Sequence, residues 1–241
     1  MPITVEVIDA YASEAAINEV FSYFEYIDKK FSTYKDTSEI TQINNGKIKE
    51  ADYSEDMESV FVLSDETKIK TSGYFDIAAP NEKYDPSGLV KGWAIYNASK
   101  LLEEHGFNNF YIDAGGDIQV HGKNSEGQSW RIGIRNPFNP KEIVKALCIQ
   151  DKGVATSGTY IRGQHIYNPY KVNKPITEIV SLTVIGPNIY EADRFATAAF
   201  AMSEKGIMFI ENLDGFEGCM IDRNGVAIMT SGFEKYTKEY A

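Results

Sequence analysis

Basic clusters and long apolar runs are both missing from this sequence. The chain of 241 residues carries 24 Lys and Arg against 35 Asp and Glu, so its formal net charge is −11. No group of Lys and Arg could form the basic face of a nucleic-acid-binding protein, which argues against that class. No apolar stretch reaches the length of a transmembrane helix, so no integral membrane segment is expected.

Cysteine is equally scarce, with only Cys148 and Cys219 in the chain. Each lies in an apolar run, and neither has a second Cys or His nearby at the spacing of a zinc site. Two buried thiols are the preferred interpretation, although a single disulfide between them stays open. The N-terminal stretch MPITVEVIDA lacks the basic start and apolar core of a signal peptide, and we expect a cytoplasmic protein.

What the sequence does have is the composition and patterning of a globular α+β protein. Hydrophobic residues make up 43% and aromatic residues 12%, enough for a large core in one domain spanning residues 1–241. Apolar spacing and turn residues predict helices over 13–31, 55–72, 89–105, 191–202 and 207–212, with a short helical start before residue 43. They predict strands over 2–8, 110–112, 117–121, 130–135, 143–149, 153–156 and 179–185, and a closing hairpin over 218–221 and 226–230. These elements indicate mixed sheets with flanking helices.

The turn before the predicted helix at 89–105 is the first candidate site. Asp85, Ser87 and Gly88 lead directly into that helix. A helix start offers free N–H groups to an anion, Ser87 is a candidate cap, and Lys91 adds a cation. A capped helix with a solvated lysine accounts for this segment equally well, because the turn lacks the spacing of a phosphate-binding loop.

Two glycine-containing turns are further candidates. The adjacent glycines at 115–116 lie between two predicted strands, where they allow a close approach of a ligand or simply form a bulge. Around a second turn, Ser157, Arg162 and His165 occur within nine residues. Arg162 could clamp a phosphate, and His165 could act as an acid or base near neutral pH. A structural histidine is the plainer alternative.

The predicted helix at 191–202 carries a possible metal-binding pair. Asp193 and Thr197 are four residues apart, so their side chains share one face of the helix. Two oxygen ligands at this spacing suit a hard cation such as Mg²⁺. The alternative is an ordinary helix with an acidic residue in its first turn.

These segments occur in an order that resembles the ApbE family, the FAD:protein FMN transferases. The shared motifs are Ser-Thr-Tyr at 32–34, Ser-Glu-Ile at 38–40, Asn44, Gly-x-Phe-Asp at 73–76, Asp-x-x-Gly-x-x-Lys-Gly at 85–92, Gly-Gly-Asp at 115–117, Ser-Gly at 157–158, His-x-x-x-Pro at 165–169 and Ala-Asp-x-x-Ala-Thr-Ala at 192–198. Each motif is weak alone, but the ordered set covers nearly the whole chain.

The resemblance implies an α+β architecture related to the T-fold and a phosphoryl-transfer reaction. FAD is cleaved, FMN is joined through a phosphoester to a Thr or Ser of a target flavoprotein, and AMP leaves. The resemblance also implies Mg²⁺, held by the side chains of Asp193 and Thr197 and by the Gly88 carbonyl.

The remaining site assignments also come from the resemblance. Asp85, Ser87 and Lys91 line the FAD site, and Tyr34, Ala78, Ala79 and Pro80 lie against the flavin or the adenosine. His165 activates the target hydroxyl, with Ser157 and Arg162 near the phosphates.

The chain departs from the family pattern in ways that keep two alternatives open. The stretch between Phe75 and Asp85 is shorter than usual, and the residues after His165 lack the family's Asp-Pro-x-Thr-Gly run. The same site could therefore serve an FAD pyrophosphatase, which uses water as the acceptor and releases FMN and AMP. It could also serve a non-catalytic FAD-binding protein.

Overall fold

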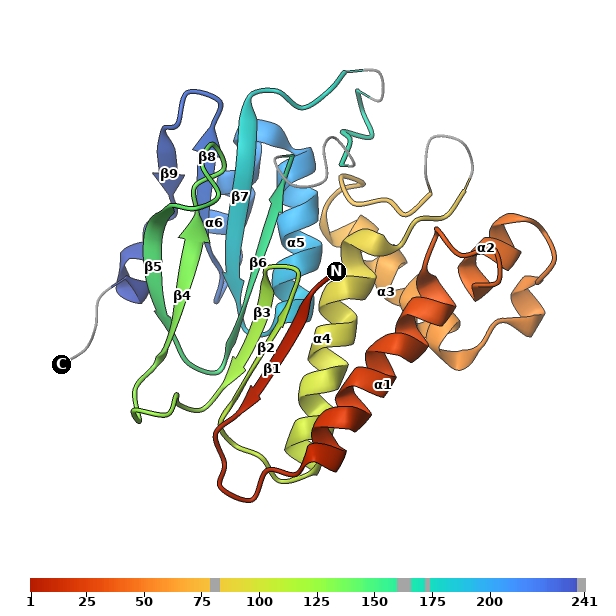
Figure 1. Cartoon of the computed structure of the whole chain (residues 1–241). Coiled ribbons are helices and arrows are strands. Elements are labelled where there is room, and N and C mark those ends of the chain that lie inside the picture. The colour runs from red at the N-terminus through yellow and green to blue at the C-terminus, as the bar shows by residue number, and fades with distance from the viewer. Residues whose placement is uncertain (79–82, 160–165, 172–173, 238–241) are drawn as a thin grey trace.

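One large antiparallel sheet separates a layer of helices from a β-hairpin (Figure 1). The computed structural model describes residues 1–78, 83–159, 166–171 and 174–237. The large sheet has the strand order β1-β2-β3-β6-β7-β8-β9. Its strands are β1 (Ile3–Val7), β2 (Phe110–Ala114), β3 (Asp117–His121), β6 (Lys152–Gly158), β7 (Ile179–Gly186), β8 (Glu217–Asp222) and β9 (Ala227–Met229). The remaining two strands, β4 (Trp130–Arg135) and β5 (Ile143–Ile149), pair only with each other. This arrangement confirms the predicted α+β class.

Six α-helices lie on the described part of the chain. They are α1 (Glu14–Phe31), α2 (Glu39–Asn44), α3 (Glu55–Lys70), α4 (Ser87–Glu104), α5 (Ile189–Ala201) and α6 (Gly206–Glu211). Three short 3-10 turns accompany them at η1 (Glu50–Asp52), η2 (Ser203–Lys205) and η3 (Phe233–Tyr236). Helix α5 packs on the middle of the sheet, and α4 lies between α5 and α1 (Figure 1).

Local sequence accounts for where these helices begin and which face they bury. The hydroxyl of Ser13 accepts a hydrogen bond from the amide of Ala16 and so caps α1. The buried residues of α1 recur every three or four positions, at Ala16, Val20, Phe24, Ile27 and Phe31. This spacing gives one apolar stripe that packs inward, as the sequence pattern predicted.

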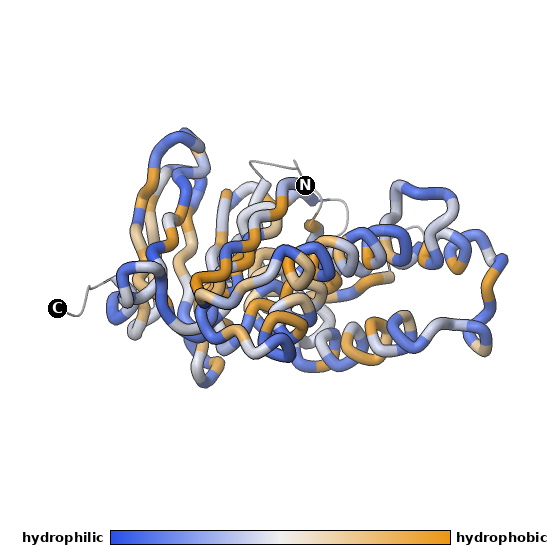
Figure 2. Tube along the Cα trace, turned by 60° about the horizontal axis from the view of Figure 1, so that its bottom comes forward, coloured by the Kyte–Doolittle hydropathy of each residue, from blue (hydrophilic) through white to orange (hydrophobic). Residues whose placement is uncertain are grey.

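Two hydrophobic clusters lie on opposite faces of the large sheet. The larger one joins the helices to residues such as Ala155, Leu182 and Val184. The smaller one joins Ile118 and Val154 to the β4–β5 hairpin. Figure 2 shows many of the apolar stretches of helices and strands in the middle of the molecule. The alternation along β6 and β7 therefore decides which residues face the helices and which face the hairpin.

The start of α5 is fastened to the sheet by a close backbone contact. A Cβ atom at Gly153 of β6 would lie 2.1 Å from the amide nitrogen of Ile189, so only glycine fits there. That amide donates a 2.8 Å hydrogen bond to Oε1 of the buried Gln119 on β3. The side chain of Asn188 accepts from the amide of Glu191 and completes the cap. This anchoring sets the position of every side chain on α5.

Both cysteines are free thiols, as expected from their sequence contexts. Cys219 is buried beneath the hairpin, and burial raises the pKa of its thiol to about 11. Cys148 is partly exposed on β5, so the expectation of burial holds for one thiol and only in part for the other. Within the described residues, no helix combines the length and the apolarity needed to cross a membrane.

Candidate active site

Helices α4 and α5 touch at a glycine, and the contact brings a buried carboxylate onto α4. A Cβ atom at Gly92 would lie 2.6 Å from Cβ of Asp193 and 2.8 Å from the carbonyl oxygen of Ile189. The amide of Gly92 donates a 2.8 Å hydrogen bond to Oδ2 of Asp193. Glycine at this position therefore allows the close approach and orients the Asp193 side chain.

A lysine and a second carboxylate complete this cluster. Lys91 forms an ion pair with Oδ2 of Asp117, and its Nζ lies 3.9 Å from Oδ1 of Asp193. Asp117 is 2% exposed and Asp193 is 3% exposed. Burial raises the pKa of Asp193 above its usual range, the Asp117 charge adds to that rise, and Lys91 opposes it. Two buried carboxylates thus share one cation, and the cluster favours additional positive charge.

Two further oxygens lie one helical turn from the contact between Gly92 and Asp193. They are the hydroxyl of Thr197 on α5 and the carbonyl of Gly88 in the first turn of α4. The Thr197 hydroxyl donates to the carbonyl of Gly88 over 3.2 Å. Two neighbouring ligands of an octahedral Mg²⁺ lie about 3 Å apart, because each is about 2.1 Å from the ion. The spacing of these two oxygens therefore fits a shared hard cation.

The donor set suits magnesium better than zinc. Asp193, Thr197 and Gly88 offer a carboxylate, a hydroxyl and a carbonyl oxygen, all of which are hard ligands. Within the ranges that the structure describes, no three His, Cys, Asp or Glu side chains gather into a metal-binding group. Of the three predicted ligands of a metal site on α4 and α5, only Asp193 would therefore supply a carboxylate.

The turn before α4 differs from the sequence prediction in one respect. Ser87 was expected to cap the helix, but it is the first helical residue, and α4 begins two residues before the predicted start at 89. Pro86 occupies the N-cap position, and Oδ1 of Asp85 accepts a 3.0 Å hydrogen bond from the amide of Ser87. Asp85 thus performs the role predicted for Ser87, because an Asp side chain two residues back reaches that amide.

Asn44 holds the same turn in place from a distant part of the sequence. Its side-chain amide donates to the Tyr84 carbonyl over 2.9 Å, and its Oδ1 accepts from the Tyr84 amide over 2.7 Å. This two-way bond joins the end of α2 to the segment that carries Asp85. Asn44 therefore holds the backbone of Tyr84, next to Asp85, in a fixed position.

Several predicted site residues lie apart from this cluster or outside the described residues. Ala78 bridges to Tyr84 in the loop before α4. Ser157 is buried near the end of β6 and shares with Ala155 the face toward the helices. Tyr34, between α1 and α2, is 97% exposed, so its ring is accessible. The other predicted residues, Ala79, Pro80, Arg162 and His165, fall outside the described residues.

Sequence reasoning missed the buried arginine of the metal-binding helix. Arg194 is 2% exposed, and its Nε and Nη2 donate to Oε2 of Glu191 over 3.1 and 2.6 Å. Its Nη1 donates to the Thr67 hydroxyl of α3 over 2.9 Å. The guanidinium also lies over the rings of Tyr190 and Phe195. Arg194 thus ties α5 to α3, and its place inside the conspicuous 192–198 motif was the available signal.

We expect Arg194→Met to lower the free energy of unfolding by about 2–4 kcal/mol, because it leaves Glu191 without its cation in a largely buried setting. The partial exposure of Glu191 keeps the loss below that of a fully buried pair. Urea denaturation would measure it, with Arg223→Met on the exposed β8–β9 turn as control. Equal stability of the two variants would contradict the assigned role.

Two curated proteins with similar sequences carry the same name. The chain is 29% identical over 161 residues to the FAD:protein FMN transferase of Klebsiella pneumoniae, a match covering 63% of this chain and 46% of that protein. It is 28% identical over 167 residues to the protein of the same name from Escherichia coli, covering 65% and 47%. The chain therefore spans about half the length of the curated relatives it matches.

Solved structures share the fold over almost the full chain. The flavin transferase ApbE from Vibrio cholerae superposes with a TM-score of 0.84 at 21% identity, covering 97% of this chain and 95% of that one. The ApbE protein from Thermotoga maritima superposes with a TM-score of 0.85 at 19% identity, covering 98% and 96%. The model of the ApbE family matches residues 1–82 and 78–220. Most of the chain fits that model, and the protein belongs to the ApbE family.

Proposed function

We propose that this protein is an FAD:protein FMN transferase that depends on Mg²⁺. The observation that carries the proposal is the cluster at the α4–α5 contact, where the Thr197 hydroxyl meets the Gly88 carbonyl and Asp193 lies near Lys91. Phosphoryl transfer needs cationic groups positioned where charge builds up on phosphate oxygens. The names of the curated relatives support the same reaction.

In the proposed reaction, a Ser or Thr hydroxyl of a target protein attacks the phosphorus of the FMN half of FAD. A new P–O bond forms to the acceptor, the bond between that phosphorus and the AMP oxygen breaks, and AMP leaves. The hydroxyl proton passes to a base, a role that the family resemblance gives to His165, with Arg162 near the phosphates. When bound, Mg²⁺ would neutralise charge on the phosphoryl oxygens.

The described residues support this chemistry through position and charge. The amide of Gly92 and the ion pair with Asp117 fix Asp193 and Lys91 before any ligand arrives. Preorganised groups lower the activation barrier because they need no reorientation during the reaction. Asp85 and Ser87 lie on the exposed turn at the start of α4, where a bound FAD would meet the partial positive charge of the helix N-terminus.

The direct test is incubation with FAD, Mg²⁺ and short peptides that each carry one Thr. We expect some peptides to gain the mass of the FMN group while an equal amount of AMP appears. AMP release at the same rate with and without peptide would instead indicate the pyrophosphatase. FAD that stays bound and intact would indicate a non-catalytic flavin-binding protein.

His165→Ala should slow transfer by about 10²–10⁴-fold if the imidazole is the general base. The matched control is His105→Ala at the end of α4, where the ring contacts Glu19 and stacks on Phe107, neither of which belongs to the proposed site. Both variants should bind FAD as the wild type does, measured by quenching of flavin fluorescence. Equal transfer rates in the two variants would contradict the role proposed for His165.

A further inference from the structure

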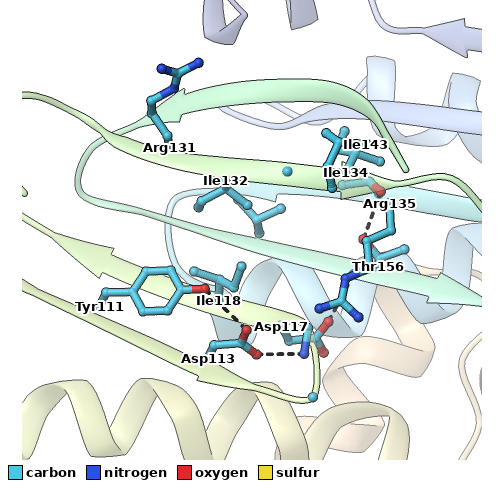
Figure 3. A pocket seen from close by; sticks show the side chains of 15 residues that line it. Tyr111, Asp113, Asp117, Ile118, Arg131, Ile132, Ile134, Arg135, Ile143 and Thr156 are labelled. Carbon is cyan, nitrogen blue, oxygen red and sulfur yellow. Dashed lines mark hydrogen bonds between the residues drawn. The ribbon is translucent and has the colours of Figure 1, made fainter. Parts of the chain in front are cut away.

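A cavity of about 240 Å³ lies between the large sheet and the β4–β5 hairpin (Figure 3). Its floor includes Tyr111, Asp113 and Thr156 on the large sheet, and its roof includes Ile132 and Arg135 on β4. The cavity is on the face of the sheet opposite α4 and α5. None of its lining belongs to the residues proposed for FAD or Mg²⁺.

The cavity nevertheless adjoins the proposed reaction centre through Asp117. Asp117 is part of the cavity lining, while its carboxylate pairs with Lys91 on the helix side. The amide of Thr156, another lining residue, donates to Oδ1 of the same carboxylate over 3.1 Å. Only the thickness of one sheet therefore separates a ligand in the cavity from the α4–α5 cluster.

One wall of this region is a strand edge without a partner among the described strands. The ladder between β3 and β6 stops at the pair Ile118 and Val154, but β6 continues to Gly158. Thr156 directs its amide to the β3 side, and residues two apart in a strand point the same way. The backbone of Gly158 therefore faces the same open edge, which could accept an added strand.

A cationic side chain that has no hydrogen-bond or ion-pair partner among the described residues lies at the cavity. The Arg135 side chain points into the cavity toward Asp113 and Asp117 (Figure 3), and it forms no hydrogen bond or ion pair within the described residues. Asp113 is already engaged, because its oxygens accept from the Gly116 amide over 2.7 Å and from the Tyr111 hydroxyl over 3.3 Å. Arg135 is therefore available to a carboxylate from outside.

We propose that this cavity docks the acceptor segment of the target protein. The segment lies extended along the open edge of β6, and an acidic side chain near the acceptor Thr or Ser pairs with Arg135. This inference rests on the proposed function, since it assigns the second substrate of the same reaction. Backbone bonds supply the affinity, and the ion pair selects the sequence.

Matched peptides test the assignment. Each peptide carries one Thr, and each pair differs only by Asp or Asn at one position flanking it. Binding is followed by fluorescence anisotropy with FAD present and Mg²⁺ absent. We expect at least one Asp peptide to bind about 10-fold more tightly than its Asn twin, as a charge-assisted bond allows. Arg135→Glu should remove or reverse that preference.

Arg131→Glu is the control, because it makes the same charge change on the same strand and the Arg131 head group points away from the cavity (Figure 3). This variant should keep the preference. Unchanged FAD affinity and circular dichroism would show that Arg135→Glu is folded. A preference that survives Arg135→Glu, or no peptide binding at all, overturns the docking site. Binding that depends on Arg135 without any FMN transfer would contradict the proposed reaction alone.

Discussion

Asp193→Asn should reduce FMN transfer by about 10³-fold or more while leaving the protein folded. The amide keeps the shape of the side chain, and its oxygen can still accept the hydrogen bond from Gly92. It loses the negative charge, which is the strongest attraction that the site offers to a divalent cation. Burial disfavours the charged carboxylate, so a neutral side chain should not lower the free energy of unfolding.

Transfer rates over a Mg²⁺ titration, together with urea denaturation, would separate the two effects. Asp65→Asn is the control, because Asp65 is an exposed acidic residue of α3 far from the cluster in sequence. The control should transfer FMN at the wild-type rate. A rate for Asp193→Asn within a few-fold of wild type would remove Asp193 from the metal site.

Gly92→Ala should impair both stability and transfer. Alanine is the better helix former by about 1 kcal/mol, so an increase in stability would follow if only propensity mattered. The added methyl group would meet Cβ of Asp193 and the carbonyl of Ile189, both far inside contact distance. Overpacking of this kind costs about 1–3 kcal/mol, and the backbone carbonyl on α5 has little freedom to move away. The clash therefore outweighs the gain in propensity.

The clash also displaces the carboxylate of the site, so we expect transfer to fall more than stability alone explains. Urea denaturation and the peptide transfer assay would measure the two losses. Lys100→Ala on the same helix is the control, because Lys100 lies near the helix surface and contacts Glu103 and Tyr96 of its own helix. A Gly92→Ala protein that is more stable than wild type would show that the α4–α5 contact tolerates a methyl group.

Sequence patterns correctly predicted those features of the fold that depend on one helix alone. The apolar stripe of α1 and the shared face of Asp193 and Thr197 both follow from helical spacing, and the structure has both. The start of α4 was misplaced because Asp85 and Ser87 are both good capping residues. The sequence does not reveal which of them has its backbone outside the helix.

Features that depend on packing between distant elements could not be predicted in the same way. The pairing of Lys91 with Asp117 requires α4 to pack against β3, and these residues are far apart in the chain. The buried setting of Arg194 depends on α3, which contributes Thr67. The hairpin strands were expected, but nothing in their sequence placed them over the large sheet, so the cavity at Arg135 had no sequence signal.

The hydrogen bond between Gln119 and the first amide of α5 should resist local unfolding at this end of the helix. Helix ends usually fray first, because their amides are satisfied only by water. Here that amide is held by a buried side chain of a central strand, and Gly153 lets the backbone sit directly on the sheet. Local opening at this helix end would have to break into the core. We therefore expect Asp193 and Thr197, the metal ligands proposed on α5, to be released only when the core around the start of this helix opens.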